Sequence, residues 1–571
     1  QRSSNALGKY GVNGIRETLE RLLPDPAQPP SEDAKLIAAL TLTALLRIKQ
    51  AASVPAIANQ LRSPDADLRW QAANALARIR DGIAPTVPAL VNLLTDKDAL
   101  VRANAARALG VAQDKSAVEP LARLLADPDE RVIASAINAL GQLADARAVE
   151  PLIAKGNALL EGYRSFNRQQ LGVPTQQNLL LLIATALGNS KDPRALPFLK
   201  SFRFADGKLG ASPEVEIAVA KFGEAAFFDV PAGVTLPKDD WKAMAAYAQG
   251  LGQLGTERAK TTLLDLLSGK TYGKPDARAV SDILNALAAA KVEGLREILL
   301  EQLRAEDVIV RATAATLLGD LGDNSDMVVK ALEDAYKAAR TDKMNDARIA
   351  ILEAADKLKR PMNVQALAEP TRDPDYVVRL KALELLRQSG TQDNLARLQA
   401  TPIETKRNRL YYRRMTELSE SKNPVAVIHT KKGDIRIELF AEDAPMTVDN
   451  FIQLARSKFF DGLTFMRVVP NFVVQTGDPR NDQNGGPGYS IRCEINLHPY
   501  QAGTVGMALS GKDTGGSQFF ITHSPQPHLD GGYTAFGQVV AGMDVVNRLA
   551  RGDVMERVEI VGGDYSVVNS R

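Results

Sequence analysis

The chain has 571 residues, which is too long for one domain and predicts several domains or a repeat array joined to a domain. Apolar residues make up 45% of the sequence and the net charge is +2, so nothing in the composition points to nucleic acid or an anionic membrane as a partner. No apolar run approaches the about 20 residues of a transmembrane segment, and the single cysteine, Cys493, excludes an intrachain disulfide and a cysteine-based zinc site.

The chain begins with Gln1 in place of methionine, which we interpret as the mark of a processed or trimmed product. A removed signal peptide or lipoprotein leader predicts export to the periplasm or attachment to a membrane. A cytoplasmic location is the alternative.

Residues 1–404 repeat one helical pattern. It is clearest in "LVRANAARALG" from Leu100, "RVIASAINALG" from Arg131 and "IVRATAATLLG" from Ile309. Successive units are about 30 residues apart, and second helices such as "TVPALVNLLTD" lie between them. One period is helix, tight turn, helix, and stacked units bury a continuous Ala/Leu seam. The sequence therefore predicts an all-α solenoid. The units resemble the HEAT-like repeats of bacterial solenoids, which implies a scaffold that binds an unknown protein partner.

Two stretches of the first part interrupt this regularity. The segments "EGYRSFNRQQLGVPTQQN" and "FDVPAGVTLPKDD" lie between about Gly156 and Lys238 and are typical of connecting loops, although long loops can also carry binding sites. Residues 405–424 are basic and contain two tyrosines. We interpret them as a last capping helix and a linker, in preference to a nucleic-acid or phosphate patch.

Residues 425–571 show strand patterns. A hairpin is predicted where two β-runs meet at Lys432-Gly433-Asp434. A helix follows in "APMTVDNFIQLARSKFF", with Thr447 as its expected N-cap, and a second helix is expected in "GMDVVNRLA". Five further short β-runs lie between them. Many short strands with two helices predict a closed β-barrel with helical end-caps, and hence a multidomain α + β chain.

Four blocks of this last part are similar to those of the cyclophilin-type peptidyl-prolyl cis/trans isomerases. They are "FMRVVPNFVVQTGDP", "GGPGYSIRCEI", "GMALSGKDTGGSQFFIT" and "HLDGGYTAFGQVVAGMDVV", and the resemblance runs from Val425 to about Val567. It implies an eight-stranded antiparallel β-barrel with two capping helices. It also implies catalysis of rotation about X–Pro bonds in proline-containing proteins or peptides, a reaction that needs neither cofactor nor metal.

The resemblance further implies a proline-binding groove on the outer face of the barrel. The catalytic set would be Arg467, Gln475 and Phe520. The substrate contacts would be Phe472, Val473, Ala508, Leu509, Gln518, His528, Leu529 and Tyr533. Of these, Val473, Leu509, His528 and Tyr533 differ from the residues of the best-known eukaryotic members. The change at His528 affects expected cyclosporin binding more than catalysis.

Other readings of single residues carry less weight. Asp478 and Glu494 could form an acid/base pair, but structural hydrogen bonding is the preferred interpretation. His523 and His528 lack a third metal ligand at suitable spacing, and Cys493 lacks a neighbouring base. For the chain as a whole the alternative to an isomerase is a non-catalytic scaffold whose last domain only binds proline-containing segments.

Overall fold

The computed structural model describes residues 15–207, 209–210, 212–236, 238–358, 370–388 and 408–562. Over these ranges a helical solenoid runs to residue 388, and a β domain begins at Val425. The predicted capping helix and linker over 405–424 is described only from residue 408, and the last residues of the β domain, 563–571, lie outside the described part. Within the described ranges, no helix has the length and apolar character needed to cross a bilayer.

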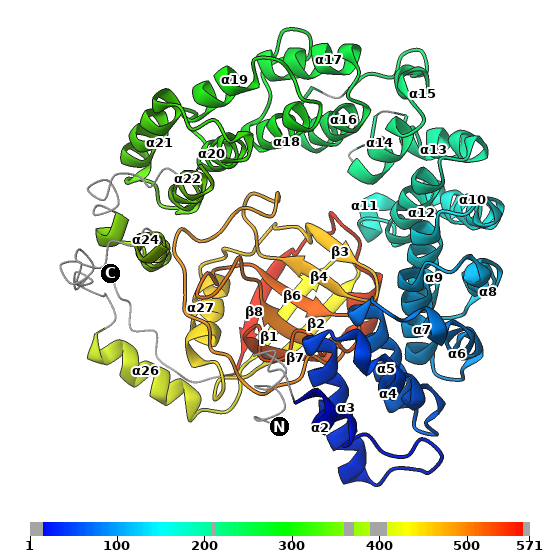
Figure 1. Ribbon diagram of the computed structural model, residues 1–571. Coiled ribbons are helices and arrows are strands. Elements are labelled where there is room, and N and C mark those ends of the chain that lie inside the picture. The colour runs from blue at the N-terminus through cyan, green and yellow to red at the C-terminus, as the bar shows by residue number, and fades with distance from the viewer. Residues whose placement is uncertain are drawn as a thin grey trace.

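The solenoid consists of two layers of helices that follow one another along a curve (Figure 1). The inner helices pack on each other in chain order and are α3 (Glu32–Ile48), α5 (Ala66–Ile79), α7 (Ala99–Ala112), α9 (Glu130–Leu143), α12 (Gln176–Ser190), α14 (Pro213–Ala220), α16 (Trp241–Leu254), α18 (Ala277–Ala289), α20 (Val308–Leu321), α22 (Asp346–Lys357) and α24 (Tyr376–Gln388). The outer helices are α4 (Val54–Asn59), α6 (Val87–Asn92), α8 (Val118–Arg123), α10 (Val149–Ser165), α13 (Leu196–Arg203), α15 (Glu224–Phe228), α17 (Glu257–Ser268), α19 (Leu295–Gln302) and α21 (Asp326–Ala339). Two short helices, α2 (Arg16–Glu20) and α11 (Arg168–Leu171), complete this part. The predicted all-α solenoid is confirmed.

Where the repeat carries the Val-Arg motif, as in "LVRANAARALG" and "IVRATAATLLG", the arginine links its unit to the next one. The guanidinium of Arg102 donates to the carbonyl oxygen of Asp96 at 2.8 Å and to both carboxylate oxygens of Asp127 at 2.7 and 2.9 Å. Arg69 repeats this arrangement one unit earlier, with the carboxylate of Asp96 as its partner at 2.8 and 3.0 Å. A planar guanidinium can satisfy a carboxylate and a carbonyl together, which explains the use of arginine rather than lysine.

The glycine that ends the same motif lets neighbouring inner helices approach closely. A Cβ built on Gly110 would lie 2.7 Å from the Cα of Ala139, and one on Gly319 would lie 2.8 Å from the Cα of Ala354. A side chain at either position would force the two helix backbones apart. Glycine at the end of the motif is therefore a packing residue.

An antiparallel sheet with the strand order β3-β4-β6-β5-β7-β2-β1-β8 forms the β domain. Its strands are β1 (Val425–Thr430), β2 (Gly433–Leu439), β3 (Arg467–Val469), β4 (Val473–Thr476), β5 (Thr504–Met507), β6 (Phe519–Thr522), β7 (Ala535–Ala541) and β8 (Arg557–Val561). The predicted hairpin is present, since Thr430 pairs with Gly433 across a two-residue turn. Strand β8 pairs with β1, although its sequence was not among the β-runs identified above.

The sheet curls into a half-barrel, and backbone hydrogen bonds connect the segments beside its two edge strands, β3 and β8. The N–H of Phe465 donates to the carbonyl of Asp553, and the N–H of Met555 donates to the carbonyl of Leu463, each at 2.8 Å. These bonds join the segments that precede β3 and β8. The eight-stranded antiparallel fold with two helices, α27 (Pro445–Arg456) and α28 (Met543–Arg548), is confirmed.

Helix α27 begins differently from the prediction. Its N-cap is Ala444, with Pro445 as the first helical residue, so Thr447 is not the cap. The backbone N–H groups of Met446 and Thr447 instead donate to the carboxylate of Glu494, at 2.9 and 2.7 Å. A carboxylate from a distant loop thus satisfies the positive end of the helix, which a local pattern cannot reveal.

Helix α26 (Arg409–Ser419) occupies the basic stretch before Pro424. Leu418 is fully buried in the core of the β domain, and Arg414 forms an ion pair with Asp449 on α27. The stretch contains a helix, and this helix packs on the β domain where the sequence suggested the end cap of the solenoid.

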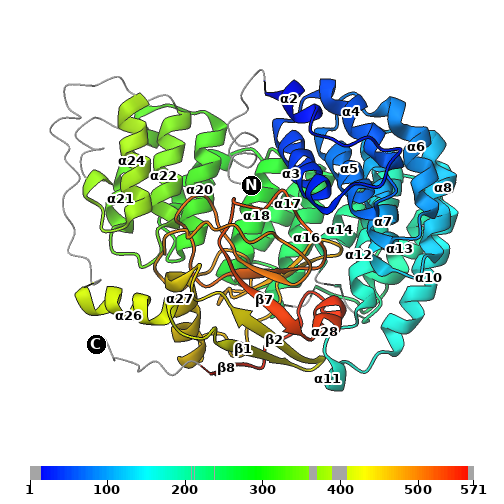
Figure 2. The same cartoon turned by 90° about the horizontal axis from the view of Figure 1, so that it is seen from below.

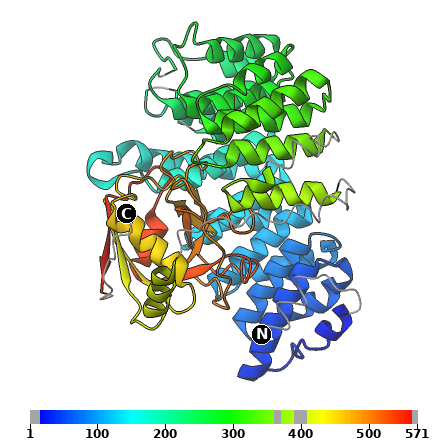
Figure 3. The ribbon, with the colours of Figure 1, turned by 90° about the vertical axis from the view of Figure 1, so that its left-hand side faces the viewer.

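The β domain lies on the concave side of the solenoid (Figure 1), and the two turned views show it against the solenoid helices (Figures 2 and 3). The segment 161–178, which the sequence suggested to be a connector, forms part of the contact. The N–H of Val173 donates to the carboxylate of Asp553 at 2.8 Å, and the side-chain amide of Asn178 donates to the carbonyl of Leu549 at 2.8 Å. This interruption of the repeat is therefore a docking segment for the β domain.

Candidate functional site

The three residues predicted to be catalytic lie side by side on adjacent strands. Arg467 on β3 is directly opposite Gln475 on β4, and Gln475 is directly opposite Phe520 on β6. Directly opposed residues of antiparallel strands point to the same face of the sheet. The pairing register therefore brings these side chains together, although Phe520 is distant from the other two in the sequence.

An apolar cluster covers the outer face of the sheet next to Arg467. Its members from the predicted site are Val473, Phe520 and Leu529, which are buried, and Phe472, Ala508 and Tyr533, which are half-buried. The neighbours of Phe520 on β6, Phe519 and Ile521, point the other way into the barrel core. The strand alternation thus separates the barrel core from an outer apolar floor.

A chain of hydrogen bonds leads away from Arg467. Its Nη1 donates to Oε1 of Gln475 at 3.2 Å, and Nε2 of Gln475 donates to Oε1 of Gln518 at 3.0 Å. Nε2 of Gln518 in turn donates to the carbonyl oxygens of Gln483 and Gly485, at 3.0 and 2.8 Å. The two glutamines hold one another and fix the position of the guanidinium.

The guanidinium of Arg467 lies at the edge of the apolar cluster, 5.7 Å from the centre of the Phe472 ring. Burial lowers the pKa of Arg467, and the nearby Tyr533 acts in the opposite direction. A guanidinium stays protonated at neutral pH even so. Arg467 therefore presents charged N–H donors in a partly apolar setting, where a hydrogen bond is stronger than in water.

Two residues that support the cluster were not predicted. Tyr500 is 1% exposed and stacks on Phe520 with ring centres 5.6 Å apart. Gly506 is paired with Phe520 across β5 and β6, and a Cβ there would lie 2.4 Å from the Phe520 ring. The absence of a side chain at Gly506 leaves room for this ring. No local signal identifies either residue, because their roles depend on which strands pair.

The rim of the cluster contacts the solenoid. The His528 ring stacks on Phe472 with centres 5.7 Å apart, and its Nε2 lies 3.1 Å from Nη2 of Arg78 on α5. The side-chain amide of Asn471 donates to the hydroxyl of Ser135 on α9 at 3.1 Å. Burial, together with surrounding cations that include Arg78, lowers the pKa of His528 to about 3. The imidazole is therefore neutral and accepts a hydrogen bond from Arg78.

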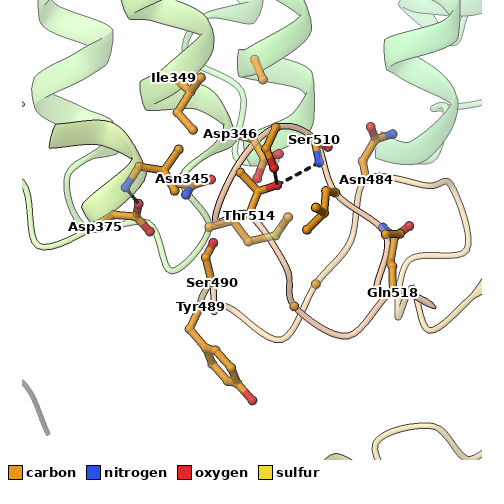
Figure 4. A pocket seen from close by; sticks show the side chains of 18 of the residues that line it. Asn345, Asp346, Ile349, Asp375, Asn484, Tyr489, Ser490, Ser510, Thr514 and Gln518 are labelled. Carbon is orange, nitrogen blue, oxygen red and sulfur yellow. Dashed lines mark hydrogen bonds between the residues drawn. The ribbon is translucent and has the colours of Figure 1, made fainter. Parts of the chain in front are cut away.

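A cavity of about 980 Å³ lies between the polar part of the site and the solenoid (Figure 4). From the predicted site it is lined by Gln475, Ala508, Leu509 and Gln518. Helices α20, α22 and α24 and the turn before α22 line its other side. The candidate site thus has an apolar floor on β4 and β6 and a polar side that opens into a space between the two domains.

The preferred interpretation of the two carboxylates is confirmed. Asp478 accepts the backbone N–H groups of Arg480, Asp482 and Gln483, at 2.7, 2.9 and 2.6 Å. Glu494 accepts those at the start of α27. Both side chains are engaged in holding loops and a helix end.

The remaining candidates have structural surroundings. Burial raises the pKa of Cys493, whose sulfur accepts the backbone N–H of Asp513 at 3.2 Å, so the thiolate is disfavoured. Burial and the charge of Arg131 lower the pKa of His523 to about 4. In the part of the chain that the structure describes, no group of three or more His, Cys, Asp or Glu side chains is arranged to hold a metal ion.

Comparison with known proteins assigns the two parts to two kinds of family. The model of the cyclophilin type peptidyl-prolyl cis-trans isomerases matches residues 425–564. The model of HEAT repeats matches residues 87–156, and that of the PBS lyase HEAT-like repeat matches residues 68–96.

Several isomerases are similar to the β domain. A peptidyl-prolyl cis-trans isomerase of Synechococcus elongatus is 53% identical over 138 residues, which are 24% of this chain and 95% of that protein. Peptidyl-prolyl cis-trans isomerase B of Bacillus subtilis is 53% identical over 130 residues, which are 22% of this chain and 91% of that protein. The crystal structure of a Cryptosporidium parvum isomerase of the cyclophilin type is 28% identical and covers 25% of this chain and 98% of its own, with a TM-score of 0.23.

The two bacterial relatives consist almost entirely of the matched domain, and about half of their residues are identical to those of this chain. The chain therefore belongs to the cyclophilin-type peptidyl-prolyl cis-trans isomerases, through a domain that follows an array of HEAT repeats.

Proposed function

We propose that the β domain accelerates rotation about X–Pro bonds in protein substrates with Arg467 as its catalytic residue, and that the solenoid is a protein-binding scaffold. The observation that carries this proposal is the position of a charged donor beside an apolar floor. Arg467 is held by Gln475 at 3.2 Å and borders the cluster that contains Phe520.

The reaction requires no bond to be broken. Amide resonance gives rotation a barrier of about 18–20 kcal/mol, which must be overcome at the twisted state. A catalyst must therefore bind the twisted amide more tightly than either planar form. A site built from a hydrogen-bond donor and an apolar surface, without a nucleophile, is suited to that task.

Each part of the site has a role in this scheme. The floor formed by Phe472, Val473, Phe520 and Leu529 would hold the proline ring and exclude water. The guanidinium of Arg467 would then donate to the prolyl nitrogen, whose lone pair becomes available only when resonance is broken. A donor fixed in advance and directed at a group of the transition state is an efficient catalytic device.

Replacing Arg467 with alanine tests the proposal. The full chain should accelerate the proline-limited refolding of a model protein, and Arg467→Ala should lower kcat/KM by about 100-fold, because one preorganised donor contributes about 10²–10³ in rate. Refolding is followed by fluorescence at several enzyme concentrations. Arg436→Ala is the control, because Arg436 is an exposed arginine on β2, outside the site.

Two results would contradict this assignment. If the wild-type chain leaves the slow refolding phase unchanged, the alternative of a non-catalytic scaffold that only binds proline-containing segments is favoured. If Arg467→Ala and Arg436→Ala both retain full activity, the isomerase role stands and Arg467 is not its donor.

A further inference from the structure

We propose that helices α22 and α24 of the solenoid complete the substrate groove, so that the chain acts on extended, unfolded segments lying between its two domains. This inference rests on the proposed isomerase function and adds a class of substrate and a second wall to the site. In stand-alone relatives, which consist almost entirely of the isomerase domain, such a wall has no counterpart within the matched region.

The first observation is that both domains line one cavity. On one side lie Gln475, Ala508, Leu509 and Gln518, all residues of the predicted substrate groove. On the other lie apolar side chains of the solenoid, Ile349 on α22 and Leu380 on α24 among them. Leu380 is 39% exposed, which is high for a leucine on an inner helix. Figure 4 shows Ile349 and Asp346 of α22 facing the loops that carry Ser510 and Gln518.

The second observation is that this cavity adjoins the catalytic centre. Gln475 lines the cavity and also holds Arg467 at 3.2 Å. Gln475 is directly opposite Phe520 in the sheet, so the proline floor begins one strand away. A polypeptide whose proline lies on Phe520 would therefore run past Gln475 and into the space below α22.

The third observation is that contacts between the two domains lie at the starts of two helices that line this cavity, α20 and α24. Arg480 pairs with the carboxylate of Asp307 at the start of α20, at 2.6 Å. The guanidinium of Arg492 lies 5.6 Å from the centre of the Tyr376 ring at the start of α24. These contacts tie the helices of the proposed second wall to the β domain.

The size of this space determines what can enter. A volume of about 980 Å³ is at the upper end of ordinary ligand pockets and accommodates a short run of extended polypeptide. On the opposite side of the proline floor the rim is covered by α5 and α9, through Arg78 and Ser135. A folded domain cannot reach a groove bordered on both sides by solenoid helices, whereas an unfolded segment can.

Filling the cavity tests the inference. In the full chain, Ile349→Trp should lower the acceleration of refolding of an unfolded protein by about tenfold, because the displaced segment no longer positions its proline well. Isomerisation of a blocked Ala-Pro dipeptide, measured by NMR exchange, should stay within about twofold of wild type, since the dipeptide ends before the wall. Leu380→Trp, at a more exposed position of the same wall, should reproduce this split.

Ile298→Trp is the matched control, because Ile298 is also half-buried but lies on the outer helix α19, away from the cavity. It should leave both substrates unaffected. The inference is overturned if Ile349→Trp and Leu380→Trp both fold and leave refolding activity unchanged, or if they lower activity on both substrates equally. A wild-type chain that accelerates neither substrate would overturn the proposed function itself.

Discussion

His528 shows how the solenoid alters the chemistry of a residue at the site. In the full chain its Nε2 faces Arg78, and the charges of Arg47, Arg107 and Lys49 also act on it. Burial and these cations lower the pKa of His528 to about 3. The same imidazole on a stand-alone domain would meet water where these side chains lie.

Acidification should weaken this contact. The folded pKa of about 3 lies below the ordinary value of 6.5, so the unfolded chain takes up the proton first and stability is lost as the pH falls below 6.5. Between pH 7 and pH 5 the loss from His528 should be about 1–2 kcal/mol. Chemical denaturation at both pH values measures it.

His528→Gln is the matched variant for this measurement, because glutamine keeps an acceptor for Arg78 but does not titrate. It should lose less stability than wild type between the two pH values. Part of the loss that remains in the variant should come from His523, whose pKa is also lowered. Equal losses in wild type and variant would show that folding does not lower the pKa of His528.

At the scale of residues, the family pattern names residues that lie far apart in the sequence, and the sheet brings them together. Arg467, Gln475 and Phe520 are identified by their place in two blocks, and the register of β3, β4 and β6 unites them. Tyr500 and Gly506 escape prediction because their function arises only when distant strands pair. Arg78 and Ser135, which the solenoid contributes at the rim of the site, could not be predicted either. The repeat pattern does not encode which surfaces of the two domains meet.

At the scale of elements, the solenoid depends on close approach between inner helices. Gly110 ends the motif on α7, and a Cβ there would lie 2.7 Å from the Cα of Ala139 on α9. In an ordinary helix interior, Gly→Ala stabilises by about 0.5–1 kcal/mol. At Gly110 the close contact with α9 turns this expected gain in stability into a loss.

We therefore expect Gly110→Ala to destabilise the solenoid by about 1–3 kcal/mol, the usual cost of overpacking. Thermal or urea unfolding followed by far-UV circular dichroism measures the change. Gly162→Ala on α10 is the control, because the nearest atom to its Cβ would be the flexible side-chain amide of Gln176 at 3.3 Å. Stabilisation by Gly110→Ala would refute the packing role of the motif glycine.

The elements that the sequence predicts are those with a strong local period. The Val-Arg-x-x-Ala helices and the hairpin at Lys432 follow directly from apolar spacing and turn residues. The start of α27 does not, because Glu494 from a distant loop supplies the cap. The segment 161–178 lacks a period since its side chains and backbone are used for docking rather than for the repeat.

At the scale of the whole molecule, the two domains are joined by polar contacts spread along the curve of the solenoid. Arg480 pairs with Asp307 near one end of the contact. Arg551 makes a bidentate pair with Glu214 at the start of α14, at 2.9 and 3.0 Å. Contacts of this kind fix orientation more than they add affinity. In the proposed arrangement they would set the spacing between the substrate groove and the helices that form its second wall.

Reversing one of these charges should loosen the docked state, and restoring the pair should repair it. Glu214→Arg places two guanidinium groups opposite each other, and the N–H of Val173, which donates to Asp553 at 2.8 Å, reports on docking nearby. We expect hydrogen exchange of this amide to accelerate about fivefold, as local opening becomes easier by about 1 kcal/mol. Adding Arg551→Glu should restore slow exchange, because the swapped pair has the same geometry with opposite polarity.

Glu119→Arg, which reverses an exposed pair with Arg147 within the solenoid, should leave the exchange rate of the Val173 amide unchanged. Unaltered exchange in Glu214→Arg would mean that the docking segment holds the domains without this ion pair.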